Sequence, residues 1–447
     1  MPLPQVALAA AIALLAGACT TRAAEPDSAS APIMVRTSGQ LAEALQPGNT
    51  GRRILVTRGE YRVDRPLQVP DGAVLEGEGV MSFDSDGLPA GFEPGTETVL
   101  RVMEGFHGQV LTLGHDSALR GLRVLDLANP PSQPPLRQGN VVYVASRAPG
   151  DVIAASILEC ELVNPNLVGF SDVGPHGHGL VVLTLNPNLG APPAAHEDAQ
   201  ISIRVQRSIV RTHSGAVVFA NNFAARGAVT IALEGNRFEG YLTVGAGVSR
   251  PDAVTDSVMR IESRGNRYLR SGRDRYGWLL LGGSTSPHFL EAGIPGAGRT
   301  ALLVDSTDDR IEGFRQGIQA AAARRIGGQS SLLMDNRLEL RLRGTRIRSD
   351  GDGAADLVLH GALSEIAQAE GPGEYPAGDR NVLQVTMENA TGSGLRRNVY
   401  ADVRGPTKVQ NHGVGNRLEI AGDAASFGRA NPGIDPLPSA RFFVGTP

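Results

Sequence analysis

The sequence predicts an all-β protein whose short strands stack as the coils of a solenoid. Three observations predict this fold class. Short β-type segments broken by Gly, Asn, Asp and Pro begin at residue 33, similar segments recur at intervals in the twenties, and asparagine turns accompany them. Among 447 residues, 56 glycines and 29 prolines allow frequent turns without a low-complexity composition. The formal net charge of −4 argues against a dedicated nucleic-acid binder, so nucleic acid is not an expected partner.

Residues 1–18 have the features of a signal peptide. Residues 6–18 form an apolar run that is too short to span a bilayer but suits the core of an export signal. Small residues at positions 16–18 then precede Cys19, and this stretch resembles a bacterial lipobox. The resemblance implies an exported protein whose only membrane attachment is a lipid on Cys19. Thr20, where an Asp would imply retention at the inner membrane, implies an outer-membrane lipoprotein that faces the periplasm or the cell surface.

The segment after this cysteine differs from the rest of the chain. Residues 19–32 are small and polar without hydrophobic periodicity, which predicts a flexible tether. The second cysteine, Cys160, shares a strand face with two leucines and is flanked by Glu159 and Glu161. Because neighbouring carboxylates disfavour a thiolate, the sequence predicts a buried structural thiol there rather than a nucleophile.

The central part of the chain contains an internal repeat. The segment 201–205 recurs as 229–233 and 258–262, at intervals of 28 and 29 residues. Later partners, at spacings stretched by insertions, are 338–342, 382–386 and 418–422. A period in the twenties predicts coils of chain that each bury one face against their neighbours. Such coils need no helices to join parallel strands.

Asparagine turns stand beside these repeats, as at Asn236 and Asn266. Asparagine tolerates left-handed dihedral angles and can hydrogen-bond to the asparagine one coil away, so we expect these two residues to be vertical neighbours. Three stretches do not fit a bare coil and are expected to project as loops: 128–139, 186–198 and 284–299. The stretch 311–325 fits either a helix or a coil, and we favour the coil.

The start of the repeat region resembles a known group. Residues 37–45, then Gly59-Glu60-Tyr61 and 74–79, are similar to the N-terminal entry of single-stranded right-handed parallel β-helix proteins, the pectate-lyase-like superfamily. The resemblance implies a short cap helix and a right-handed parallel β-helix over residues 33–430, followed by a C-terminal tail over 431–447. It also implies polysaccharide clients, often acidic ones. The fold itself hosts many functions and does not define one.

One edge of the predicted solenoid gathers candidate catalytic residues. His178 lies in Gly177-His178-Gly179, which resembles a motif of polygalacturonase-type hydrolases on this fold, although the other motifs of that family are missing. His213 is expected one coil further on, and Asp172, His176 and Glu239 are expected along the same edge. Histidines and carboxylates on one edge suit proton transfer or a metal. The alternative is a set of turn residues facing water.

Arginines indicate a substrate-binding face. They cluster on two coils, and Arg260, Arg264, Arg341 and Arg343 are candidate ligands for substrate because alternate residues of a strand face outward. Guanidinium groups bind carboxylate or sulfate through two hydrogen bonds, so an anionic glycan is the expected client. The alternative is a solvated face in which Asp and Glu balance the arginines.

Cofactor signals are weak. The run Asp350–Asp356 resembles a short calcium loop, but the acid that would close such a loop falls on Gly361. We therefore expect no cofactor and no metal, with calcium left as an alternative. Trp278, the single tryptophan, heads an apolar run and is expected in the core or as a sugar platform.

Two functional hypotheses remain open from the sequence. In the first, the protein is a lyase or hydrolase that cleaves an extracellular polysaccharide with the residues around His178. In the second, it is a non-catalytic surface protein that binds a glycan or a protein partner. The first hypothesis requires Asp172, His178 and His213 to converge within hydrogen-bond reach.

Overall fold

The structure is a computed structural model of the whole chain. Its descriptions cover residues 31–106, 108–126, 139–166, 169–171, 174–184, 197–248, 256–285, 298–326, 333–351, 354–365, 373–376, 378–392, 395–397, 401–402, 408–411, 415–422 and 441–444. The predicted signal peptide, Cys19 and almost all of the predicted tether lie outside these residues. So do most of the three predicted loops. Within the described part, no helix is long and apolar enough to cross a membrane.

A short helix closes the N-terminal end of the molecule. Helix α2 (Ser38–Ala44) begins after Thr37, whose side-chain oxygen accepts a hydrogen bond from the Gln40 amide at 3.2 Å. This N-cap satisfies one of the amides that have no partner inside the helix. Leu41 and Ala44 are buried against the first coil. The helix is thus the expected cap that covers the open end of the apolar core.

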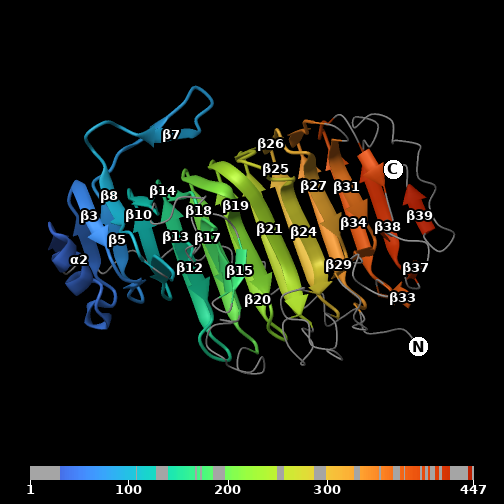
Figure 1. Ribbon diagram of the computed structural model, residues 1–447, viewed down its shortest axis with the longest axis horizontal. Helices are drawn as coiled ribbons and strands as arrows, with labels where there is room; N and C mark the ends of the chain where they lie inside the picture. Colours follow the sequence, from blue (N-terminus) through green and yellow to red (C-terminus); the bar gives the residue numbers. More distant parts are fainter. Residues whose placement is uncertain are drawn as a thin grey trace.

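The described strands form two large parallel sheets, and the fold is the expected all-β parallel β-helix. The first, sheet A, has 13 described strands, in spatial order β1 (Ile33–Val35), β2 (Arg53–Val56), β5 (Val74–Gly77), β10 (Ser117–Arg120), β13 (Val152–Leu158), β18 (Gln200–Gln206), β20 (Ala228–Glu234), β22 (Val258–Arg264), β25 (Ala301–Thr307), β29 (Arg337–Arg343), β34 (Val382–Glu388), β38 (Arg417–Gly422) and β39 (Arg441–Val444). Strand β39 extends this sheet into the region expected to be a tail. Figure 1 shows the coils stacked along the long axis from α2 to β39.

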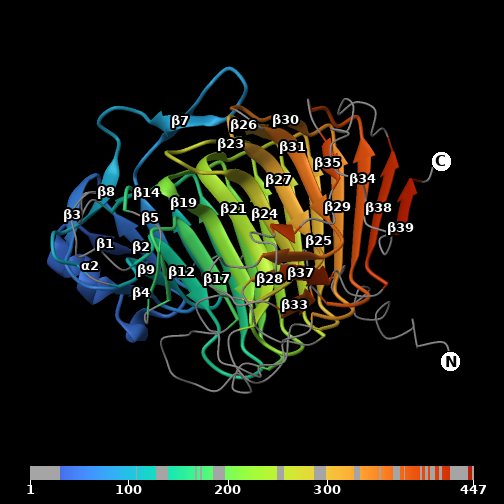
Figure 2. The same ribbon diagram turned by 45° about the vertical axis from the view of Figure 1, so that its right-hand side comes forward.

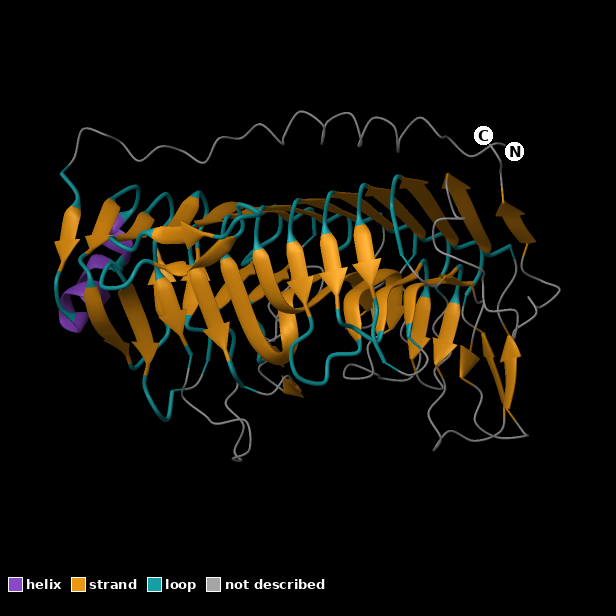
Figure 3. Ribbon diagram, turned by 90° about the horizontal axis from the view of Figure 1, so that it is seen from above, coloured by secondary structure: helices purple, strands orange, loops and turns teal. Residues whose placement is uncertain are grey.

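The second, sheet B, covers the other sides of the coil. Its 20 described strands are β3 (Gly59–Val63), β4 (Leu67–Val69), β8 (Thr98–Val102), β9 (Leu111–Leu113), β11 (Arg123–Leu125), β12 (Val142–Ala145), β14 (Glu161–Asn164), β17 (Leu180–Leu183), β19 (Ile209–Asn222), β21 (Arg237–Val248), β23 (Arg267–Leu269), β24 (Tyr276–Thr285), β26 (Arg310–Glu312), β27 (Gln316–Ala321), β28 (Arg324–Ile326), β30 (Arg346–Arg348), β31 (Ala355–His360), β32 (Leu363–Glu365), β35 (Leu395–Arg397) and β36 (Ala401–Asp402). Seen from above, sheets A and B form the opposite walls of a flattened tube (Figure 3).

Sheet B turns a corner because its longest strands bend. The first residues of β19 pair with β14, and its later residues pair with β17. The pairing of β19 with β21 shifts register between Arg211 and Val218, which marks a bulge at the corner. We call the part formed by β11, β14, β23, β26, β30 and the first residues of β19 and β21 the short-strand side of sheet B.

Three small two-stranded sheets project from the coils: β6 (Met81–Phe83) with β7 (Pro89–Phe92), β15 (Gly169–Ser171) with β16 (Gly174–His176), and β33 (Gly373–Pro376) with β37 (Lys408–Asn411). The β6–β7 hairpin was not predicted from the sequence. The view in Figure 2 shows this hairpin running along the upper edge of the stack toward β23 and β26. Residues 311–325 contain β26, β27 and the start of β28, so the coil interpretation of this stretch is confirmed.

The register confirms the repeat and corrects part of its alignment. Ile201 pairs with Val229, as expected from the interval of 28 residues. Val229 pairs with Met259 rather than Val258, and Leu338 pairs with Leu383 rather than Val382, so the expected alignment of these two coils is wrong by one residue. The side-chain period of a strand explains the difference, because a one-residue slip would turn Arg260 into the core and Met259 outward. The coil that contains β25 was also missed.

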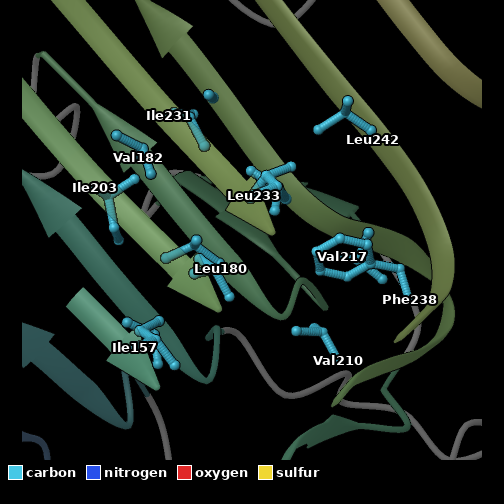
Figure 4. Close-up of a cluster of buried hydrophobic side chains, with 14 of the residues drawn as sticks. Ile157, Leu180, Val182, Ile203, Val210, Val217, Ile231, Leu233, Phe238 and Leu242 are labelled. Carbon is cyan, nitrogen blue, oxygen red and sulfur yellow. The ribbon is translucent and has the colours of Figure 1, made fainter. Parts of the chain in front are cut away.

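The core fills the inside of the tube with a continuous column of aliphatic side chains. Figure 4 shows one segment of it, where side chains from β13, β17, β18, β20 and β21 point toward one another. Rings of Phe238 and Tyr268 stack at 4.9 Å, and Tyr268 meets Trp278 edge-on at 5.2 Å. Trp278 is fully buried, which confirms the core expectation for it. Cys160 is also buried, and burial raises the pKa of its thiol to about 12.

Polar ladders hold the corners on both sides of sheet A. At the corner after sheet A, the amide and side-chain nitrogens of Asn236 donate to Asn266 Oδ1 at 2.8 and 2.9 Å. Those of Asn266 donate in turn to Asp309 Oδ1 at 2.8 and 3.1 Å. The predicted contact between Asn236 and Asn266 is therefore confirmed. A second ladder, before sheet A, joins Asn336 to Asn381 and Asn381 to Asn416.

Candidate functional site

His178 is a buried residue that fixes the backbone at the corner of sheet B. Its Nδ1 accepts a hydrogen bond from the Ala216 amide at 2.9 Å, and its ring stacks on Phe219 at 5.1 Å. Its own amide donates to Asn140 Oδ1 at 3.0 Å. Burial, with a smaller contribution from His176, lowers the pKa of His178 to about 3. The imidazole is therefore neutral at physiological pH and holds two coils together.

The other residues of the predicted edge lie in different environments. His213 is exposed on the bulge of β19. His178 instead forms its hydrogen bond with Ala216, three residues after His213 in the chain. Glu239 forms ion pairs with Arg211 and Arg237, both at 3.1 Å. Asp172 lies outside the described residues. The structure thus places His178 and His213 in separate surroundings, and their proposed catalytic roles stay predictions.

All four predicted arginines lie on the outward face of sheet A, but in different rows across its strands. Arg264, Arg341 and Arg343 point outward from sheet A and line one depression of about 390 Å³. Arg204, which the sequence analysis did not select, lines the same depression because β18 lies two strands before β22. Arg260 is the exception. It is half-buried one row away and forms an ion pair with Glu262 at 3.5 Å.

This depression continues along sheet A. A second depression of about 430 Å³ is lined by residues of β29, β34 and β38. Arg341 lines both, so the two depressions adjoin along the stacking direction. Because each coil adds one strand at a spacing of about 4.8 Å, a chain of linked sugars can follow this face across several coils. We call this surface the sheet A groove.

The charges of the groove are mixed. Arg204, Arg264, Arg341 and Arg343 line the larger depression together with three carboxylates, Glu234, Glu262 and Asp305. Asp305 lies 3.8 Å from Arg341 and 3.5 Å from Arg343. An anionic ligand there would have to displace these internal ion pairs. The groove also offers carboxylates as acceptors for sugar hydroxyls.

A buried carboxyl group lies where the turn 270–275 packs on the bulge of β19. The Arg273 amide donates to Ser214 Oγ at 3.2 Å, which brings the turn against the residue after His213. Asp274, beside it, is 5% exposed, and its Oδ2 has no hydrogen-bond partner. Burial raises the pKa of Asp274 to about 8. This group was not predicted, since nothing in the local sequence marks it as buried.

The structure bears little on metals. No group of three or more His, Cys, Asp or Glu side chains in the described part of the chain could hold a metal ion. In the run that resembles a calcium loop, Asp356 is buried and its Oδ1 accepts a hydrogen bond from the Ser349 amide at 2.7 Å. Asp352 lies outside the described residues. The absence of a cofactor stays a prediction, with calcium at this loop as its alternative.

Comparison with known proteins adds no relative: no family model, no curated protein and no solved structure matches this chain.

Proposed function

We propose that this protein binds an extended anionic polysaccharide along the sheet A groove. The observation that carries the proposal is the continuity of the groove over β18 to β38, with Arg341 shared by its two depressions. Outward arginines on every second strand, β18, β22 and β29, provide paired donors for carboxylate or sulfate groups along the groove. The flat and open form of the face suits a polymer rather than a small molecule enclosed on all sides.

Binding is favoured over cleavage for the described residues. His178, the strongest candidate for acid–base work in the sequence, uses its Nδ1 to accept the Ala216 amide, and its pKa lies far below neutrality. A general base needs a lone pair that reaches the substrate and a pKa near the working pH. His178 has neither property in this conformation.

The proposal includes the location of the protein. A signal peptide over residues 1–18 and a lipid on Cys19 would place the β-helix outside the cytoplasm, on the outer membrane, with residues 19–32 as its tether. An acidic extracellular or envelope polysaccharide is then a partner within reach.

A titration of the full mature chain tests the function. Polygalacturonate is the anionic probe, neutral dextran is the comparison, and calorimetry measures binding at low and at physiological salt. The Arg264→Glu/Arg341→Glu variant is expected to bind at least tenfold more weakly, because two attractive contacts become repulsive. The matched control is Arg62→Glu, an exposed outward residue of β3 at the N-terminal end. Equal affinity of both variants and the wild type would rule out the groove, and the appearance of unsaturated or reducing ends would favour cleavage.

A further inference from the structure

The short-strand side of sheet B carries a second concentration of arginines. Arg267 pairs in register with Arg310, and Arg310 pairs with Arg346, so three guanidinium groups start from equivalent positions on successive coils. Arg348 adds a fourth on β30. Strands β23, β26 and β30 contain one carboxylate, Glu312. We call Arg267, Arg310, Arg346 and Arg348 the arginine row.

The members of this row differ in their ion pairs. Arg267 Nε lies 2.8 Å from Glu312. Arg346 and Arg348 are exposed, and no ion pair within the described residues involves either of them. The row therefore carries more positive than negative charge, in contrast to the sheet A groove, where carboxylates nearly balance the arginines.

The β6–β7 hairpin places its tip on the row. Arg310 Nη1 donates to Asp86 Oδ2 at 2.6 Å, across 224 residues of sequence. Asp84 Oδ1 accepts the Asp86 and Leu88 amides at 2.9 and 3.0 Å, which shapes the turn that carries Asp86. Nearer its base, the hairpin rests on the Arg207 guanidinium, which lies 5.9 Å from the centre of the Phe83 ring.

From this geometry we infer that the arginine row is a carboxylate-binding site for an anionic polysaccharide, and that Asp86 occupies its Arg310 position until the ligand arrives. The contact between Asp86 and Arg310 shows how the row can hold a carboxylate, because this carboxylate of the chain itself already occupies one of its positions. The inference rests on the proposed function only for the class of ligand, and it concerns a different face of the coil.

The strength of the Asp86 contact suits a replaceable occupant. Both partners are more than one-third exposed, with side-chain exposures of 37% for Arg310 and 45% for Asp86. Ion pairs between exposed groups contribute little, because water and salt screen them. A polymer that presents several carboxylates can reach Arg310, Arg346 and Arg348 together. Its linked groups bind with a high effective concentration, which a single aspartate cannot match.

The test replaces Asp86, which competes with the ligand for Arg310. The Asp86→Ala variant of the full mature chain should bind polygalacturonate about two- to fivefold more tightly than the wild type, the range that corresponds to one exposed ion pair. The matched control is Asp64→Ala, which removes one exposed negative charge at the end of β3, far from the row. If Asp86→Ala binds polygalacturonate no more tightly than the wild type and Asp64→Ala do, the inference is overturned.

Three further measurements separate this site from the groove. Arg346→Ala/Arg348→Ala should weaken binding at least threefold, and polygalacturonate should speed amide exchange in residues 81–92 of the wild type. The ratio between Asp86→Ala and wild-type affinities should persist in the Arg264→Glu/Arg341→Glu background. If the ratio persists but the groove substitutions themselves do not change affinity, only the proposed function of the groove is refuted. If the ratio is lost, the inference about the arginine row is refuted.

Discussion

Replacement of Asp309 by asparagine should stabilise this protein at neutral pH. Asp309 occupies the position that asparagines hold one and two coils earlier, and it accepts two hydrogen bonds from Asn266. Its second oxygen accepts from Ser306 Oγ at 2.6 Å. The side chain is fully buried, and burial raises the pKa of Asp309 to about 6 from an ordinary value of 3.8. Asparagine keeps the shape and the accepting oxygen without a charge.

The sign and size of the effect follow from this pKa. The folded state holds the proton of Asp309 more tightly than the unfolded state, so the contribution of Asp309 to the free energy of unfolding is highest below pH 4 and falls as the pH rises toward 6. A shift of about two units corresponds to about 3 kcal/mol lost above pH 6. Asp309→Asn does not titrate, so its advantage over the wild type should be small at pH 4 and approach about 3 kcal/mol at pH 7.

Urea unfolding at a series of pH values measures this difference. Fluorescence of Trp278 reports on the same region, because its ring meets Tyr268, whose hydroxyl lies 3.0 Å from Ser263 Oγ in the ladder. The control is Asp308→Asn, the same chemical change at an exposed neighbour, which should alter stability little at any pH. The reasoning fails if Asp309→Asn is less stable than the wild type at pH 7, or if its advantage does not grow with pH.

Three other predictions concern stability. His178 has a lowered pKa, so its contribution to the free energy of unfolding should fall as the pH falls from about 6.5 toward 3. His178→Asn keeps an acceptor for the Ala216 amide and should lose less stability than the wild type over this range in acid unfolding experiments. Asn236→Ala should cost about 2–3 kcal/mol in urea unfolding, because the buried Ser208 amide then loses its acceptor; a neutral result would deny the ladder a stabilising role. Ile231→Ala, at a fully buried site, should cost about 2–5 kcal/mol, and a loss below 1 kcal/mol would mean that the tube is loosely packed.

The fold was predictable because the sequence repeats its physical constraints on every coil. Alternation of apolar and polar residues sets which face is buried, and Asn236 and Asn266 mark a corner where a left-handed turn and a ladder are both required. Alignment by similarity alone failed at Val258, since two adjacent apolar residues, Val258 and Met259, fit the pattern equally well. Only the requirement to keep Arg260 outward decides between them.

The candidate site was less predictable because it depends on the spacing between coils. Arg264 and Arg341 were selected as substrate ligands and do line one depression, but Arg204 was missed because its coil carries no other arginine in the strand. His178 was selected for its glycine neighbours, which mark a tight corner as readily as a reactive site. The contact between Asp86 and Arg310 joins residues 224 positions apart, and no local pattern announces it.

The β6–β7 hairpin also has a mechanical consequence. Stacked coils interact mainly with their immediate neighbours, so a solenoid can fray from one end while the remainder stays intact. The hairpin begins after β5, the third strand of sheet A, and its tip reaches the coil of β26, so it spans several coils. Because the contact of Asp86 with Arg310 is one exposed ion pair, it would slow fraying from the C-terminal end only slightly, but it would couple the unfolding of the coils that the hairpin spans.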